Sequence, residues 1–297
     1  MPRYKLTVAY DGADFSGWQK QEPEDPALGG GVETGAVRRA RAEGLEAGGP
    51  GRVALRTVQA VLERAVREVV REPVTLTGAS RTDAGVHAWG QVAAFTCSGD
   101  GPAGAPASRT GGWPAARGPE ALVRAINARL PDDVLVRAAT IVDDGFDPIA
   151  HCASKAYSYT FHSSPDRPLW DRRYVCHTRH RLDIEAMRAG ARALVGEHDF
   201  GAFAAAGHGR SSTVRTIYTC DVRELDAEDG AQRARIDVSG NGFLYNMVRI
   251  IAGTLHEIGR GRIEAGAVPA IVASGDRRRA GPTMAPDGLR LEWVRYD

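Results

Sequence analysis

The chain has 297 residues and a mass of 31.8 kDa, which leaves room for two domains of about 150 residues each. Apolar residues make up 43% and charged residues 25%, so the composition excludes a wholly disordered or fibrous protein. The 38 basic and 37 acidic residues give a net charge of +1, so a nucleic-acid partner would have to bind a local basic patch.

No apolar run approaches the roughly 18 residues of a membrane span. Met1 opens directly into a strand-like segment, which does not resemble a signal peptide. The sequence therefore predicts a soluble, cytoplasmic protein with no membrane partner. The cysteines lie far apart with no CxxC pair, which favours buried thiols: Cys97, Cys152, Cys176 and Cys220.

The first half predicts the order β-α-β-β-α-β. Residues 3–10 alternate apolar and polar side chains, as a half-buried strand does. Thr57 caps a helix with one apolar face, and Pro119 and Pro131 bracket a second helix. The predicted elements are a strand at 3–10, a helix at 57–70, the strand VTLT at 74–77, a loop at 78–88, a strand at 91–96, a helix at 119–130 and a strand at 134–142.

The second half repeats this order. Its predicted elements are a strand at 155–163, a helix at about 183–195 capped by Gly196, strands near 215–225 and 233–239, a helix from about 243 closed by Gly259, a shorter helix, and a strand at 289–296. The pattern predicts an α+β fold of two ferredoxin-like (βαββαβ) halves with a joined antiparallel central sheet.

The predicted halves are residues 1–145 and 146–297, with the linker falling near 143–152. Residues 22–51 are rich in Gly, Glu, Ala and Pro, and residues 98–119 are of low complexity and have no apolar period. Both predict mobile loops inserted into the first half.

The densest polar cluster in a predicted loop runs from Arg81 to His87. Asp83 beside Arg81 would stay ionised, and an ionised carboxylate can act as a nucleophile or a base. The alternative is a turn aspartate that accepts backbone N–H bonds, with Gly85 supplying a positive φ. The tripeptide Arg81-Thr82-Asp83 alone favours the turn aspartate.

The loop segment GASRTDAGVHAWGQVAAF resembles the active-site loop of the bacterial tRNA pseudouridine synthase A family. Other segments resemble the family in the same order and cover nearly the whole chain apart from the two insertions. They are YDGADFSGWQKQ, TVQAVLERAV, INARLPDDV, GEHDFGAF, NGFLYNMVRIIAGTLHEIG and APDGLRLEWVRY.

The resemblance implies isomerisation of uridine to pseudouridine at positions 38, 39 and/or 40 of the tRNA anticodon stem-loop, with no cofactor and no metal. It makes Asp83 the catalytic aspartate and Arg81 a residue that contacts RNA or helps displace the base. A uridine in a stem must leave its stack first, at a cost of roughly a few kcal/mol. Family members act as homodimers, so a homodimer is expected.

Two residues of the second half also match the family. Tyr157 corresponds to the tyrosine that stacks on the target base, although by pattern alone its alternation with Tyr159 and Phe161 is more typical of core. Arg249 corresponds to an arginine that pairs with the catalytic aspartate. Helical periodicity separates Arg249 from the apolar stripe, so the alternative is a solvated helix face.

The sequence departs from the family pattern at two positions. Ser80 replaces a glycine before Arg-Thr-Asp, which matters if that position needs a positive φ. Ile149 stands where the family commonly has an arginine, so one contact is missing or has moved to His151 or Lys155.

Other functions have weaker support. A structural metal site would need a second ligand pair besides the CHxxH cluster of Cys176, His177 and His180, which His151-Cys152 does not supply in the usual form. No nucleophile elbow indicates a hydrolase. The acidic pairs 132–133 and 143–144 lie at element ends, where caps or turns explain them better than a glycosidase site.

The alternative from another class is a non-catalytic RNA-binding protein on the same fold. Two arginine clusters, 38–41 and 277–279, could hold phosphate in either case, although such clusters are more often solvated surface. The two hypotheses differ at Asp83, which only an isomerase requires.

Overall fold

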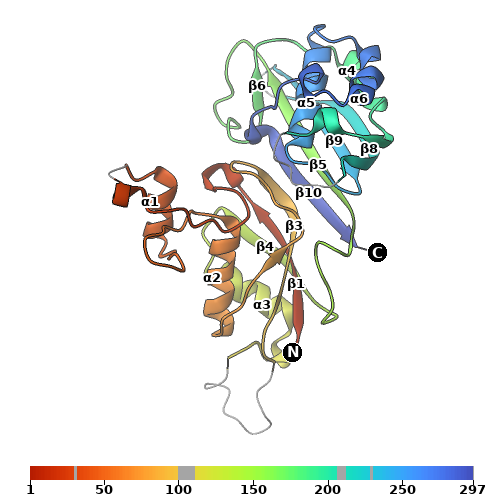
Figure 1. The fold of residues 1–297 in the computed structure, drawn as a ribbon. Helices are drawn as coiled ribbons and strands as arrows, with labels where there is room; N and C mark the ends of the chain where they lie inside the picture. The colour runs from red at the N-terminus through yellow and green to blue at the C-terminus, as the bar shows by residue number, and fades with distance from the viewer. Residues whose placement is uncertain (30–31, 100–110, 206–211, 228–229, 297) are drawn as a thin grey trace. The chain divides into compact units, whose positions relative to one another are not determined.

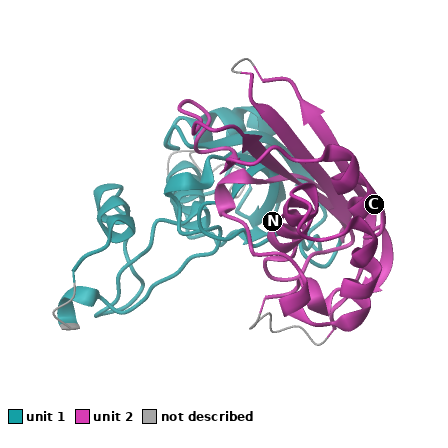
Figure 2. Cartoon of the chain, turned by 90° about the horizontal axis from the view of Figure 1, so that it is seen from above, with its two compact units in different colours: residues 1–151 teal, residues 152–297 magenta. Residues whose placement is uncertain are grey.

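The computed structural model describes residues 1–29, 32–99, 111–205, 212–227 and 230–296. The chain divides into two compact units, Met1–His151 and Cys152–Asp297, which Figure 2 colours separately. Each unit combines helices with a mostly antiparallel sheet, in agreement with the predicted mixture of elements. Within the described ranges, every helix is too short or too polar to cross a membrane.

In the first unit, β1 is the middle strand, with β4 on one side and β3 on the other, and both pairings are antiparallel (Figure 1). The short β2 pairs with β3. Tyr4, Leu6 and Val8 of β1 are buried, as the alternation predicts. The elements are β1 (Arg3–Tyr10), α1 (Gly35–Ala42), α2 (Val58–Val70), β2 (Thr77–Gly78), β3 (His87–Thr96), α3 (Gly118–Asn127) and β4 (Val134–Val142).

In the second unit the strands lie in the order β10-β5-β9-β8-β7, and β6 adds to β5 in parallel. Helices α4 and α5 pack against each other, and α4 also packs on β8 (Figure 1). The elements are β5 (Cys152–Ser163), β6 (Cys176–Thr178), α4 (Ile184–Arg192), β7 (Gly196–Asp199), β8 (Val214–Leu225), β9 (Gln232–Gly240), α5 (Met247–Gly259), α6 (Val268–Ser274) and β10 (Leu289–Tyr296).

The predicted strand at 74–77 is wrong except for its last residue, because β2 begins at Thr77. Side chains of α2 bind the backbone that a neighbouring strand would have bound. Gln59 Nε2 donates to the carbonyl of Leu76 at 2.8 Å, and Arg67 Nε donates to that of Val74 at 2.8 Å. The segment is therefore tied to the helix rather than to the sheet.

Two predicted helix ends are also wrong. Helix α4 ends at Arg192, and Gly196, with φ +116°, begins β7 instead of capping the helix. Helix α5 begins at Met247 rather than near 243, because Asn246 takes a left-handed φ of 60° that cannot continue a helix.

The first insertion, predicted to be a loop, contains helix α1, which Thr34 caps by accepting from the N–H of Val37. Its two ends run side by side in a stem of backbone bonds: Val53 N–H donates to Pro23 O and Leu55 N–H to Gln21 O, both at 3.0 Å. Residues 100–110, the centre of the second predicted insertion, lie outside the described residues.

Arg56 joins the base of this stem to the rest of the unit. Its guanidinium donates two hydrogen bonds to Asp133, at 2.8 and 3.0 Å, and one to Glu43 at 2.6 Å. It also lies 4.0 Å from the ring centre of Phe15. Burial alone would lower the pKa of Arg56, but the bonds to Asp133 and Glu43 raise it above its usual value.

Replacing Arg56 by Met is expected to lower the free energy of unfolding by about 2–4 kcal/mol, because it leaves two partly buried carboxylates without their cation. Urea unfolding followed by circular dichroism measures this. Arg41→Met is the matched control, since Arg41 also bridges two carboxylates, Asp25 and Glu33, but its side chain is 53% exposed. That control should change stability by under about 1 kcal/mol, and equal losses in both variants would contradict the role of burial.

His256 lies in the core of the second unit, 6% exposed and stacked on Phe161 at 5.2 Å. Its Nε2 is 3.1 Å from the Thr178 hydroxyl, and its Nδ1 is 3.1 Å from Glu257 Oε1. Burial lowers the pKa of His256, although Glu257 opposes the shift. The folded protein therefore binds a proton at His256 less readily than the unfolded chain does.

Because the folded pKa of His256 is depressed, its contribution to stability is present above the unfolded value near 6.5 and is lost as the pH falls below it. We expect the melting temperature to fall between pH 7.5 and pH 5.5, and the non-titrating His256→Gln variant to show a shallower fall. The exposed His151→Gln is the control. If His256→Gln and the wild type lose the same number of degrees, His256 is not the source.

Candidate active site

Asp83 lies in the loop between β2 and β3, half-buried, with the exposed Arg81 two residues before it. The carbonyl of Asp83 accepts from the N–H of Val86 at 3.2 Å, and Gly85 in this turn has φ +82°. The loop therefore contains the turn that the sequence predicted. The bond that closes the turn is accepted by the backbone carbonyl of Asp83, so the turn is compatible with a reactive carboxylate at this position.

The segment from Asp11 to Trp18 supports the Asp83 loop from β1. The N–H of Trp18 donates to the carbonyl of Thr82 at 3.0 Å, and the N–H of Gly85 donates to that of Phe15 at 3.3 Å. The hydroxyls of Tyr10 and Thr82 share a buried hydrogen bond of 2.8 Å. The loop is thus fixed on both sides of Asp83 by one continuous segment.

Two glycines of this segment make the close approach possible. A Cβ on Gly12 would lie 1.9 Å from the carbonyl oxygen of Val86. A Cβ on Gly17 would lie 2.7 Å from the carbonyl oxygen of Thr82 and 3.2 Å from the carbonyl carbon of Asp83, and Gly17 has φ +91°. Any larger residue would displace the loop that carries Asp83.

His87 closes the other end of the loop. The residue is buried, and its Nδ1 accepts from the N–H of Gly12 at 3.0 Å. Asp11 Oδ1 lies 3.1 Å from the same nitrogen. The supporting segment therefore also binds the first residue of β3, directly after the loop, in addition to Thr82 within it.

Ser80, the departure from the family glycine, causes no backbone strain. Among the described residues other than glycine, positive φ is found at Arg71 and Asn246, so position 80 does not need a glycine. The buried Gln91 of β3 accepts from the N–H of Ser80 at 3.2 Å and donates to its carbonyl at 2.6 Å. Ile149, the second departure, is 54% exposed.

In the second unit, Tyr157 lies on β5 between Val238 of β9 and Leu291 of β10. It shares its face with Tyr159 and Phe161, as the alternation predicts, and all three are buried. Tyr157 is 7% exposed, and its ring meets the ring of Phe243 edge-on, with the ring centres 5.3 Å apart. Tyr159 and Phe161 are fully buried and belong to the core of the unit.

Arg249 lies in the first turn of α5 and is half-buried. Its Nε donates to the carbonyl of Met284 at 2.6 Å, and its Nη1 donates to Asn246 Oδ1 at 2.7 Å. The next residue of the same segment, Ala285, accepts from the Tyr159 hydroxyl at 2.8 Å. The segment before β10 therefore orients Arg249 on one side and contacts the β5 core on the other.

The arginine clusters considered as phosphate contacts have local partners. Arg39 pairs with Asp14, and Arg41 with Asp25 and Glu33. The Arg278 side chain binds Asp276 and lowers the pKa of that carboxyl to about 2. These pairings reduce the charge that each cluster can offer to a phosphate.

The CHxxH residues have separate surroundings. Cys176 is buried, His177 Nε2 is 2.8 Å from the Ser164 carbonyl, and His180 Nε2 is 2.8 Å from Arg260. Across the described part of the chain, no three His, Cys, Asp or Glu side chains converge as a metal site requires.

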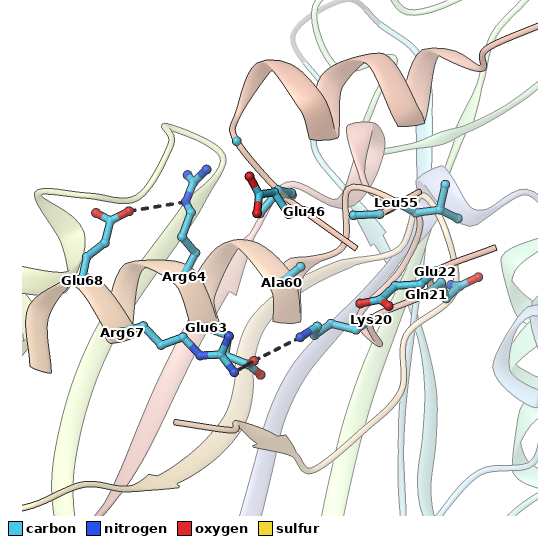
Figure 3. A pocket seen from close by; sticks show the side chains of 13 residues that line it. Lys20, Gln21, Glu22, Glu46, Leu55, Ala60, Glu63, Arg64, Arg67 and Glu68 are labelled. Atoms are coloured by element: carbon cyan, nitrogen blue, oxygen red, sulfur yellow. Dashed lines mark hydrogen bonds and ion pairs between the residues drawn. The ribbon is translucent and has the colours of Figure 1, made fainter. Parts of the chain in front are cut away.

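A pocket of about 400 Å³ lies between α2 and the first insertion (Figure 3). Its charged side chains mostly neutralise one another: Lys20 and Arg67 both contact the buried Glu63, and Arg64 pairs with Glu68. None of the residues that line it belongs to the predicted site.

Sequence reasoning missed the residues that hold the loop. The sequence did contain signals for them, namely two glycines within YDGADFSGW and a polar Gln91 in the apolar strand QVAAF. Asp83 and Arg81 lie in the first unit, and Tyr157 and Arg249 in the second.

Comparison with known proteins agrees with these motifs. A family profile described as tRNA pseudouridine synthase matches residues 191–297. The tRNA pseudouridine synthase A of Geotalea uraniireducens (strain Rf4) is 38% identical over 296 residues, covering all of both chains. Those of Acetivibrio thermocellus and Bacillus subtilis (strain 168) are each 37% identical and cover all and 99% of both chains, respectively. The chain therefore belongs to the tRNA pseudouridine synthase A family, whose members isomerise uridine.

Proposed function

We propose that this protein isomerises uridine to pseudouridine at positions 38, 39 and/or 40 of the tRNA anticodon stem-loop, with Asp83 as the catalytic nucleophile or proton acceptor. The observation that supports the assignment of Asp83 is the close packing of the loop that carries it. This loop is bonded to Tyr10 through Thr82 and lies so close to Gly12 and Gly17 that a single methyl added at either glycine would displace it. A reactive carboxylate gains rate from such fixed placement.

The reaction breaks the bond between uracil N1 and ribose C1′, turns the base and forms a bond from uracil C5 to C1′. The hydrogen on C5 leaves as a proton and N1, which has lost its bond to C1′, takes up a proton, so no oxidant or reductant is consumed. As a nucleophile, the Asp83 carboxylate would attack either the sugar or the base. At the sugar it would take the place of N1 on C1′, and C5 would displace it as the carbon link forms; at the base it would be eliminated after the link has formed. Both routes need an ionised carboxylate at this position.

The family motif assigns Tyr157 to stacking on the target base and Arg249 to pairing with the catalytic carboxylate. The edge contact of Phe243 fixes the Tyr157 ring, which suits a stacking surface. The bonds from Arg249 to Met284 and Asn246 fix its guanidinium. Arg81 is exposed and can contact RNA.

We further propose that each unit is a ferredoxin-like half. The orders β4-β1-β3, with β2 pairing to β3, and β10-β5-β9-β8 support this, since both place the first and third strands of a split βαβ side by side at the centre. We also propose a cytoplasmic homodimer, as the family resemblance implies, with light scattering as its measurement.

Tritium release from transcript tRNA labelled at uridine C5 tests the function, because the C5 hydrogen must leave when C5 becomes the glycosidic carbon. Wild-type protein should release tritium, and Asp83→Ala should release none while still binding tRNA. No release by wild type from several tRNAs with uridines at 38 to 40 would refute the isomerase proposal for those substrates and favour a non-catalytic RNA-binding protein.

A further inference from the structure

Residues 164–175, here called the Arg–Trp loop, join β5 to β6 in the second unit (Figure 1). Apolar side chains of this loop stand in solvent: Trp170 is 86% exposed, Leu169 58% and Tyr174 51%. Burying such side chains is favourable, and a cluster of them on a surface marks a contact with something else.

The sequence around these side chains is basic. Residues 164–181 contain five arginines and two aspartates. One aspartate, Asp171, is already paired with Arg233 of β9. Because β6 runs parallel to β5, with Ser163 opposite Thr178, Arg179 leaves the sheet at the same end as the start of the Arg–Trp loop. The arginines of this region are Arg167, Arg172, Arg173, Arg179 and Arg181.

Hydrogen bonds within the Arg–Trp loop hold its backbone in place. The N–H of Tyr174 donates to the carbonyl of Asp171 at 2.7 Å, which closes a turn. Arg172 Nη1 donates to the carbonyl of Leu169 at 2.9 Å, and Pro168 is buried. Trp170 is therefore presented from a fixed backbone, so little conformational entropy is lost when a partner covers it.

The charge distribution selects the partner. Arginines interleaved with exposed aromatic rings are the chemistry that holds RNA: the rings stack on unpaired bases and the guanidinium groups contact phosphates. The insertion at residues 22–51 has the opposite balance, with six acidic residues against three arginines. The net charge of +1 therefore conceals a basic, aromatic region in the second unit.

We propose that the Arg–Trp loop, with Arg179 and Arg181, is a surface that contacts RNA. In this proposal the ring of Trp170 stacks against an unpaired base of the tRNA substrate. The inference rests on the proposed function for the identity of the RNA. It adds a binding surface whose effect is on affinity, separate from the Asp83 loop.

The experiment measures the Kd of full-length protein for an unmodified tRNA transcript by filter binding over a range of KCl concentrations. Trp170→Ala should raise Kd about tenfold, and Trp170→Phe should raise it less than about threefold because a ring remains. Arg167→Ala should reduce the slope of log Kd against log salt by about one. Tritium release at saturating tRNA should stay near the wild-type rate in all three.

Tyr218→Ala and Arg262→Ala are the matched controls, because Tyr218 is 49% exposed and the Arg262 side chain 61% exposed in the same unit but outside the loop. Their Kd should match the wild type. An unchanged Kd for Trp170→Ala overturns the proposal. A lower oligomeric mass of Trp170→Ala than of the wild type in light scattering also overturns it, because this surface would then bind a second copy of the chain. Absence of tritium release by wild type would refute the isomerase function alone, since binding is measured separately.

Discussion

Asp83→Asn is expected to lower the rate of tritium release by at least about a thousandfold at saturating tRNA, because an amide can neither attack carbon nor accept the proton. The substitution preserves the size of the side chain, and asparagine tolerates turn conformations as aspartate does. The turn itself depends on the backbone bond between Asp83 and Val86, which the substitution leaves in place. Single-turnover kinetics with excess enzyme isolates the chemical step from product release.

The tRNA affinity and the melting temperature of this variant should stay close to the wild type. Asp144→Asn, in an exposed turn of the same unit, is the control for removing one negative charge from a protein that binds RNA. A rate within tenfold of wild type for Asp83→Asn would remove this residue from the chemical step. Equal losses in both variants would indicate a general charge effect.

Gly17→Ala is expected to lower the same rate by about a hundredfold with little change in tRNA affinity. The added Cβ would lie 2.7 Å from the carbonyl oxygen of Thr82, so the loop must shift, and a displacement of about 1 Å at a reacting group costs this much. A purely structural effect would lower the melting temperature without a selective loss of kcat.

Gly44→Ala is the matched control. Gly44 also has a left-handed φ, of +67°, but a Cβ there would meet nothing within 4 Å. Both substitutions impose the backbone penalty, roughly 1–2 kcal/mol, and only one pushes on the Asp83 loop. If Gly44→Ala loses as much kcat as Gly17→Ala, the loss reflects stability and not the placement of Asp83.

Much of the fold could be predicted where one face of an element decides its position. The strand at 134–142 was predicted with its observed bounds, and the helix from Thr57 began where its cap indicated. The strand at 74–77 failed because its backbone partners are Gln59 and Arg67, side chains of another element. Apolar alternation carries no information about such competition.

The candidate site divides in the same way. Asp83, Tyr157 and Arg249 could be proposed because several motifs of one family occur in order. The roles of Gly12 and Gly17 could not be predicted. Each position needs a glycine because backbone atoms of residues 82–86 lie too close for a side chain, and the sequence does not show this approach. Helix α1 was not predicted because the Gly and Pro residues around it indicate a loop and outweigh the capping signal of Thr34.

The paired ends of the first insertion have a practical meaning for engineering. The stem brings Gln21 and Leu55 within one backbone hydrogen bond of each other, so the intervening residues leave and re-enter the unit at a single point. Such a junction accepts a guest domain or a shortened turn without stretching the host chain. Arg56 would keep its two bonds to Asp133 after such an exchange. Its contact with the Phe15 ring would therefore also remain in place.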